Sequence, residues 1–290
     1  MIVKPCTAPE VAFYETALQH PGFARWMPTF FGTLNLSGQG EGQGEGAAAA
    51  AAVTAAATAA TAAVVDGKPA HDRLSSLVLQ NAAYGFEKPC VLDVKLGARL
   101  WDDDAPQQKR ARLDAVSDQT TSRSLGMRVA GMKVWKGAGA GHRTYDKLYG
   151  RSFTADSVGD ALGEFFASEI SADQTALVAA RFLEKVRMVR QQLESQESRM
   201  YSASLLFVYE GDGKALARAV EARKAKDEQR DGHHDSDNDE DRDGDNDEDG
   251  LSKPAVCVRG RWQGSGACRR RAQGLGRAMG RASRWRRRRR

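Results

Sequence analysis

The sequence predicts an α+β fold, because apolar runs typical of strands and amphipathic segments typical of helices both occur along its 290 residues. Residues 2–5, 89–97 and 205–209 are short apolar segments of strand length. Helices are expected where apolar residues recur at helical spacing or where a proline occupies a tolerated first turn, at 9–18, after Pro106, at 157–166 and at 174–195.

The remaining segments are biased in composition and interrupt this pattern. Gly38 to Gly46 alternates glycine with Gln and Glu, and an Ala/Thr tract then continues to Ala63, so residues 38–63 indicate a loop insertion. A run of Asp, Glu and Asn extends from His233 to Gly250, and the sequence ends R-W-R-R-R-R-R. Runs of like charge are most often disordered, so we expect residues 212–290 to form a disordered tail, first acidic and then Arg-rich.

Charge and cysteine usage exclude several classes of protein. The net charge of +5 conceals an acidic run and a basic tail that nearly cancel, so it does not indicate a uniformly basic protein. The four cysteines are too scattered for a disulfide framework or a C-x-x-C zinc site. The longest uncharged run, 47–65, is too weakly apolar for a membrane span. We therefore expect a soluble protein of the nucleus, the cytoplasm or both, without a membrane span.

The segment P-C-V-L-D-V-K-L-G at 89–97 is the strongest candidate for a functional site. Alternate residues of a strand share a face, so the side chains of Asp93 and Lys95 are predicted to point the same way. Burying a charge is costly unless it has a partner or a ligand. From these nine residues alone, a binding site and a surface strand with an ion pair are equally good interpretations.

Pro89, Asp93, Lys95 and Gly97 match the pattern P-x-x-x-D-x-K-x-G, and the sequence here resembles the inositol polyphosphate kinase family. Further blocks resemble that family in the same order, most of all its fungal-type multikinases. They are T-T-S at 120–122 with L-G-M-R-V-A-G-M-K-V-W at 125–135, Y-D-K-L-Y-G-R at 145–151, and S-A-S-L-L-F-V-Y-E-G at 202–211.

The resemblance implies a two-lobed, protein-kinase-like fold with ATP in the cleft between the lobes. The amino-terminal ATP-binding lobe would comprise residues 1–88, without the strand that normally precedes Lys4, and 74–83 would lead into the hinge that holds the adenine. The carboxy-terminal lobe, 89–211, would bind the inositol phosphate and is incomplete by comparison with the family. The implied reaction is transfer of the ATP γ-phosphate to a hydroxyl of an inositol trisphosphate or tetrakisphosphate, with Mg²⁺.

Four residues receive roles near the nucleotide from this resemblance. Asp93 and Lys95 are the expected catalytic residues, Asp93 on the nucleotide side and Lys95 at the transferring phosphate and the substrate. Lys4 is expected at the ATP phosphates, although an exposed terminal lysine is a serious alternative. Ser204 lies in the S-L-L motif near the nucleotide phosphates, and a role in packing alone is an equal alternative.

The helix after Pro106 is expected to contribute to binding of the inositol phosphate. Lys109 and Arg112 are three residues apart and therefore share one helix face. Lys acts as a point charge and Arg as a fork toward phosphate, so such a face suits a polyanionic substrate. A solvated basic face is the usual alternative, and only the resemblance favours the substrate role.

The resemblance stops after Asp212. The family's Ile-Asp-Phe motif, whose aspartate holds the catalytic magnesium, does not occur between Gly213 and Arg290, so no metal ligand is assigned. A wrong reading frame or a retained intron after Gly250 is our hypothesis for this abrupt end. A rival interpretation is therefore a catalytically dead kinase remnant that binds inositol phosphates. A third is an RNA-binding Arg tail, but we predict no specific nucleic acid and expect a monomer.

Overall fold

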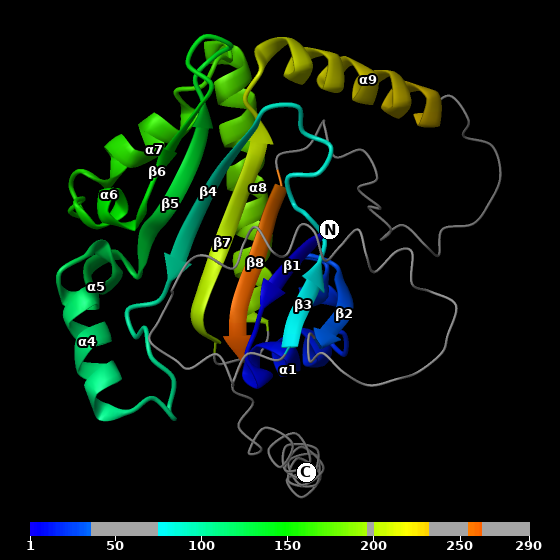
Figure 1. Ribbon diagram of the computed structural model, residues 1–290. Coiled ribbons are helices and arrows are strands. Elements are labelled where there is room, and N and C mark those ends of the chain that lie inside the picture. Colours follow the sequence, from blue (N-terminus) through cyan, green and yellow to red (C-terminus); the bar gives the residue numbers. More distant parts are fainter. Residues whose placement is uncertain (36–74, 196–199, 232–254, 263–290) are drawn as a thin grey trace, which may run out of the picture.

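The computed structural model describes residues 1–35, 75–195, 200–231 and 255–262 (Figure 1). Their strands form two antiparallel sheets, a small one ordered β1-β3-β2 and a large one ordered β6-β5-β4-β7-β8. The strands are β1 (Ile2–Pro5), β2 (Phe30–Asn35), β3 (Ser75–Leu79), β4 (Pro89–Leu96), β5 (Met127–Trp135), β6 (His142–Tyr145), β7 (Met200–Glu210) and β8 (Ala255–Trp262).

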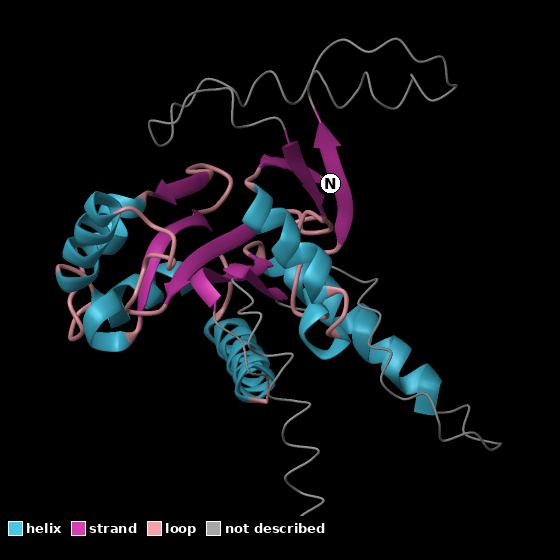
Figure 2. Ribbon diagram, turned by 90° about the horizontal axis from the view of Figure 1, so that it is seen from below, coloured by secondary structure: helices cyan, strands magenta, loops and turns pink. Residues whose placement is uncertain are grey.

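The helices lie around these two sheets. Figure 2 shows the small sheet and the long helix α8 on opposite sides of the large sheet. Among the described residues, no helix is both long enough and apolar enough to cross a bilayer. The helices are α1 (Ala8–Ala17), α2 (Pro21–Ala24), α4 (Gln107–Asp118), α5 (Thr121–Leu125), α6 (Lys147–Arg151), α7 (Val158–Phe166), α8 (Ala172–Glu194) and α9 (Gly213–Asp231).

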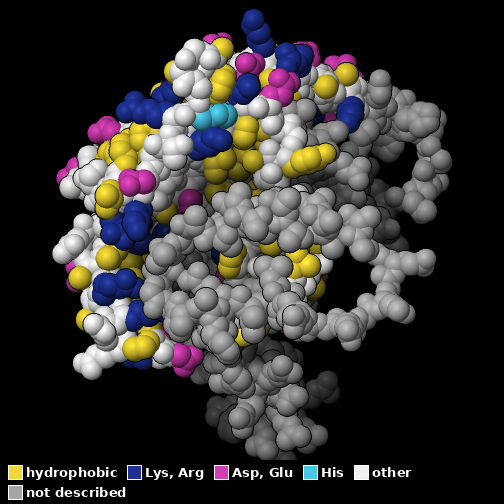
Figure 3. Space-filling model, viewed as in Figure 1, with side chains coloured by type: hydrophobic (Ala, Val, Ile, Leu, Met, Phe, Trp, Pro, Cys, Tyr) yellow, Lys and Arg dark blue, Asp and Glu magenta, His cyan; other side chains and the backbone are white. Residues whose placement is uncertain are grey.

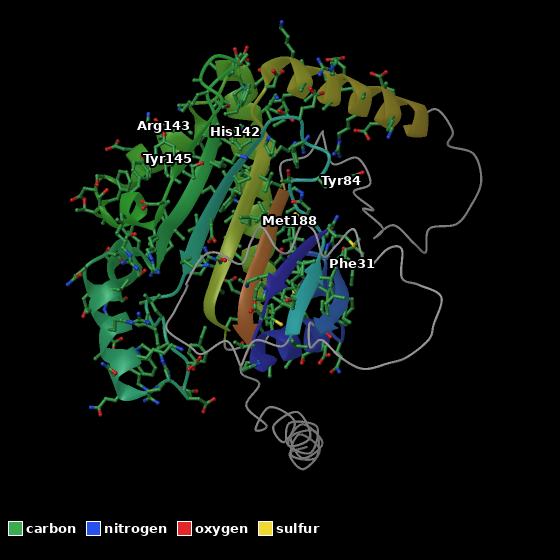
Figure 4. The ribbon with its side chains drawn as sticks, in the orientation of Figure 1. Phe31, Tyr84, His142, Arg143, Tyr145 and Met188 are labelled. Atoms are coloured by element: carbon green, nitrogen blue, oxygen red, sulfur yellow. The ribbon has the colours of Figure 1, made fainter. Side chains whose placement is uncertain are left out.

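Aromatic side chains fill the core of the amino-terminal lobe. The rings of Phe13, Tyr14 and Phe23 are buried, and Phe13 makes edge contacts with the other two at centroid distances of 5.4 and 6.2 Å. Such contacts stabilise a core beyond the area that they bury. Phe23 and Trp26, which precede β2, are buried, whereas Phe31 on β2 is 55% exposed (Figure 4).

The back of the large sheet packs on α7 and α8. Phe165 of α7 and Phe182 of α8 surround the ring of Tyr209 on β7, at centroid distances of 5.1 and 6.2 Å. The Tyr209 hydroxyl donates to the Phe165 carbonyl at 2.7 Å, so the one polar atom of this buried ring is satisfied. Burial is the main cause that raises the pKa of Tyr209. The layer of α7 and α8 covers the back of the large sheet. The opposite face of the sheet is therefore the one on which a binding site can form.

The linker between β3 and β4 is anchored to the end of β7 by one buried carboxylate. Glu210 is 1% exposed, and its Oε2 accepts from the backbone N–H of Glu87 at 2.6 Å. Its Oε1 accepts from the N–H groups of Lys88 and Asp212, at 2.9 and 3.0 Å. Tyr84 projects from the same linker and is 79% exposed (Figure 4). The linker is therefore held at its carboxy-terminal end.

The expected disordered tail is wrong for two segments within 212–290. Helix α9 begins with the Asp212 carboxylate accepting from the Ala215 N–H at 2.8 Å, and its Ala215, Leu216 and Ala219 are buried. Strand β8 pairs with β7, and Val256 is 5% exposed. Good helix formers and a β-branched apolar segment produce these elements, and the nearby charge runs obscured them. The insertion 38–63 and the rest of the tail lie outside the described residues.

Candidate phosphate-binding site

Asp93 and Lys95 lie on one face of β4, as the alternation predicts. Cys90, Leu92 and Val94 point into the core, whereas the side chains of Asp93 and Lys95 are 31% and 32% exposed. Lys95 Nζ lies 3.5 Å from Asp93 Oδ2. These two residues therefore line the opposite face, away from α7 and α8, which we call the front of the large sheet.

Ser204 joins this pair from the neighbouring strand. In the β4–β7 register Ser204 is directly opposite Lys95, and Lys95 Nζ donates to Ser204 Oγ at 3.2 Å. Ser204 is 2% exposed and thus also contributes to packing. The structure accordingly brings together three of the residues that the sequence singled out.

Arg128 completes a row across three strands, and our sequence analysis did not single it out. It is opposite Lys95 in the β4–β5 register, on the side of Lys95 away from Ser204. Its Nη1 donates to Ser122 Oγ of α5 at 3.1 Å. Burial is the main cause that lowers the pKa of Arg128, followed by the charge of Arg151, while Asp93 acts in the opposite direction. An arginine in the apolar run M-R-V-A-G was the available signal, the same one that revealed Asp93 and Lys95.

The β4–β5 register shifts beside Asp93. Asp93 pairs with Gly131 and Val94 pairs with Val129, so one strand has an extra residue at this point. Bulges of this kind bend a strand and re-aim side chains, and they are frequent next to active sites. The row of Lys95, Arg128 and Ser204 lies just beyond the irregularity.

Several buried polar atoms around this row lack a hydrogen-bond partner among the described residues. They are Asp93 Oδ1, Thr121 Oγ1 and Arg151 Nε. Buried polar atoms normally form hydrogen bonds, so a buried polar atom without a partner indicates a place where a ligand can bind. Here Lys95, Arg128 and Arg151 are three cations, and Asp93 is the carboxylate that interacts with the first two. This charge balance favours a polyanionic ligand with hydroxyl groups.

The other predicted site residues lie on separate elements. Lys4 is on β1, opposite Leu77, and forms an ion pair with Glu10 of α1. Lys109 is half-buried and Arg112 exposed, both on α4, which follows β4 along the chain. Their roles in nucleotide and substrate binding stay predictions.

A stack of cations and rings holds the loop between β4 and α4. The guanidinium groups of Arg99 and Arg110 lie 3.8 and 4.8 Å from the centre of the Trp101 ring. Arg110 Nε also donates to the Ala105 carbonyl at 2.6 Å, and Trp101 Nε1 donates to Asp114 Oδ1 at 2.7 Å. Arg110 is therefore structural, and this packing positions α4 with its neighbouring cations Lys109 and Arg112.

The described residues do not fit a metal site. No group of three or more His, Cys, Asp or Glu side chains is gathered among them to hold a metal ion. Strand β8 lies beside β7, and its sequence A-V-C-V-R-G-R-W contains no carboxylate. Its backbone register places Arg259 opposite Ser204.

The protein has two lobes joined by an anchored linker. On the front of the large sheet, Lys95 and Arg128 lie near the unpaired Asp93 Oδ1. These features are those of a protein that binds phosphorylated ligands. The sequence model of the family "Inositol polyphosphate kinase" matches residues 76–250. The inositol polyphosphate multikinase of Schizosaccharomyces pombe is 34% identical over 210 residues, which cover 72% of this chain and 72% of that protein. The multikinase of Saccharomyces cerevisiae is 33% identical over 243 residues, covering 73% and 67%.

A solved structure agrees. The crystal structure of the inositol phosphate multikinase from S. cerevisiae, in complex with ADP and Mn²⁺, superposes with a TM-score of 0.62 at 27% identity, over 91% of this chain and 89% of that one. This chain belongs to the inositol polyphosphate kinase family. The family and the α+β, two-lobed fold predicted from the sequence are therefore confirmed.

Proposed function

We propose that this protein is an ATP-dependent kinase that phosphorylates hydroxyl groups of inositol trisphosphate and tetrakisphosphate. The observation that carries the proposal is the row of Arg128, Lys95 and Ser204 beside Asp93, in a chain of this family. Phosphoryl transfer depends mainly on positioning and on neutralising charge, with little covalent chemistry for the protein to perform. Cations, a hydroxyl and one free carboxylate oxygen suit these two tasks.

The geometry supports a division of roles. Lys95 would bind the transferring phosphate, because its ammonium group has only a 3.5 Å ion pair and a 3.2 Å hydrogen bond to hold it in place. Asp93 Oδ1 is buried and free to accept from a hydroxyl, which agrees with its proposed place on the nucleotide side. Ser204 and Lys4 would contact the nucleotide phosphates, and Lys109 and Arg112 the inositol phosphates.

A divalent cation is part of the proposal, and Mg²⁺ is our choice for it. It would neutralise charge on the phosphates when bound. The relative of known structure holds Mn²⁺ with ADP, but the described residues of this chain do not gather the carboxylates that such an ion prefers. We therefore assign no step of the reaction to a metal ligand of this chain.

The test is transfer of label from γ-labelled ATP to inositol trisphosphate by the purified chain, with Mg²⁺ and then with Mn²⁺. Wild-type protein should form labelled inositol phosphate, and Lys95→Ala should lower kcat by about 100-fold or more, as loss of a transition-state contact does. Arg181→Gln, an exposed change on α8, is the control and should leave turnover unchanged.

The second candidate, a remnant that binds inositol phosphates without turnover, stays a hypothesis that the same experiment tests. It predicts that calorimetry detects inositol phosphate binding to the wild type while no label is transferred with either cation. Turnover by the wild type that is lost in Lys95→Ala would exclude it.

A further inference from the structure

Helix α6 lies beside β5, at an edge of the large sheet. β6 pairs with β5 only over residues 132–135, so none of the described strands pairs with the first half of β5 on that side. The chain leaves β6 at Tyr145 and forms α6 from Lys147 to Arg151. Asp146 caps this short helix, because its Oδ1 accepts from the Leu148 N–H at 2.9 Å. The cap fixes where α6 begins beside β5.

Gly150 allows α6 to approach the backbone of β5. A Cβ atom at this buried position would lie 2.0 Å from the Val129 carbonyl oxygen and 2.7 Å from its carbon. No side chain fits at such distances, so the close approach requires glycine. As a result Arg151, the next residue, is brought beside Arg128, the neighbour of Val129 on β5.

Arg128 and Arg151 are both half-buried and therefore partly removed from water. The charge of Arg151 acts on Arg128, whose pKa is lowered first by burial and then by this repulsion. Arg151 Nε is buried without a hydrogen-bond partner among the described residues. Bringing two like charges together in a partly buried place is unfavourable, and an anion between them removes that cost.

A hydroxyl from α5 points to the kind of anion. Thr121 Oγ1 is buried and also lacks a partner among the described residues. The adjacent Ser122 Oγ accepts from Arg128, so α5 and Arg128 are in contact. Two guanidinium forks and a hydroxyl match the several oxygens of a phosphate group. Figure 3 shows Lys and Arg side chains gathered over this part of the molecule, around α4, α5 and α6.

We propose that Arg151 and Thr121, next to Arg128, form an additional phosphate subsite, which binds a phosphate of the inositol polyphosphate other than the one at Lys95. This inference rests on the proposed function and refines it. It makes Arg151 a substrate-binding residue that recognises how highly the inositol ring is phosphorylated.

The position in the fold assigns this subsite to the inositol phosphate and not to ATP. The sheet order places β5 and α6 on the side of β4 away from β7 and β8. The linker and the small sheet, where the nucleotide is expected, lie on the other side (Figure 1). ATP and the inositol phosphate would lie one after the other across the large sheet. Arg151, beside β5, would therefore contact the inositol phosphate.

The experiment compares Arg151→Gln with the wild type in steady-state phosphorylation of inositol trisphosphate and tetrakisphosphate. Loss of one charge-assisted contact to phosphate should raise the KM for inositol phosphate about tenfold or more, with kcat and the KM for ATP unchanged. Arg151→Lys, which keeps the charge but not the fork, should recover part of the affinity. Arg143→Gln is the matched control, since Arg143 is exposed on β6 and lies over the Tyr145 ring.

An unchanged KM for inositol phosphate, or a rise in the KM for ATP instead, overturns the subsite. If Arg151→Gln does not fold, as judged by its melting curve, Thr121→Val replaces it and should raise the same KM about threefold or more. An unchanged KM in that variant overturns the subsite equally. Absence of turnover in the wild type would instead overturn the proposed function, so the two failures are distinguishable.

Discussion

The ammonium group of Lys95 lies between two acceptors on neighbouring strands, Asp93 Oδ2 at 3.5 Å and Ser204 Oγ at 3.2 Å. Both distances exceed the roughly 2.7–2.9 Å of a tight charge-assisted hydrogen bond. Both charged side chains are also about one-third exposed, so a ligand can reach them. Lys95 is thus held in position by loose contacts, which it can exchange for a phosphate at little energetic cost.

Glu164 gives a prediction about pH. Burial alone would raise the pKa of this carboxyl, but hydrogen bonds from Lys136 at 2.7 Å and from the Tyr145 hydroxyl lower it overall, below the ordinary value of 4.5. A lowered carboxyl pKa stabilises the fold above the ordinary value, and the stabilisation is lost as pH falls through the lower, folded-state pKa. Glu164→Gln should therefore be less stable than the wild type by about 1 kcal/mol at pH 7.

The measurement for Glu164→Gln is urea unfolding at pH values from 7 to 3. The difference from the wild type should shrink steadily below pH 4.5. Glu184→Gln, an exposed ion-pair partner on α8, is the control and should show almost no difference at any pH. A difference for Glu164→Gln that stays constant down to pH 3 contradicts the argument.

At the scale of elements, the linker before β4 depends on Glu210. Its two oxygens accept three backbone N–H groups, two of them from the linker residues Glu87 and Lys88. Glu210→Gln would turn an amide N–H₂ toward a backbone donor. One unsatisfied buried donor costs about 1–3 kcal/mol, so stability should fall by that amount. The displaced linker should also raise the KM for ATP while the KM for inositol phosphate stays the same.

Steady-state kinetics with both substrates, together with thermal melting, test this role. Glu87→Gln is a matched control, because the Glu87 side chain is exposed and pairs only at the surface with Arg218. It should change neither KM. If Glu210→Gln raises both KM values equally, the linker is not the part of the site that Glu210 supports.

The sequence predicted those elements whose periodicity is local. The apolar spacing in α7 and α8 and the alternation in β4 need no knowledge of distant residues. Helix α9 and strand β8 were missed because the surrounding runs of charge dominate the composition there. What stabilises both is tertiary, since α9 and β8 each pack against β7. A pattern confined to one segment does not reveal such contacts.

At the scale of the whole molecule, β8 connects the two lobes. It pairs with β7 of the large sheet, and α1 of the amino-terminal lobe also packs against it. Val256 is 5% exposed and belongs to the hydrophobic core that contains Phe13 and Tyr209. Val256→Ala should therefore lower the free energy of unfolding by about 1–3 kcal/mol. Calorimetry should show one transition at lower temperature, whereas an unchanged melting temperature contradicts a joining role for β8.

Only part of the site could be predicted from the sequence, because some of its residues are brought together by the tertiary fold. Asp93 and Lys95 are two residues apart, so one strand period reveals that they share a face. Arg128 and Arg151 reach the same place through strand register and the close approach at Gly150. Neither the strand register nor the close approach at Gly150 can be predicted from the spacing of residues within one segment.

The central claim is that the front of β4 positions the reacting groups, and a crystal structure of the complex tests it most directly. The crystals would contain the full chain with a non-hydrolysable ATP analogue and inositol trisphosphate. We expect Lys95 Nζ within about 3 Å of a phosphate oxygen and Asp93 Oδ1 within about 3 Å of a ligand hydroxyl. Ligands bound elsewhere, with the Lys95–Asp93 pair unchanged, would contradict the account.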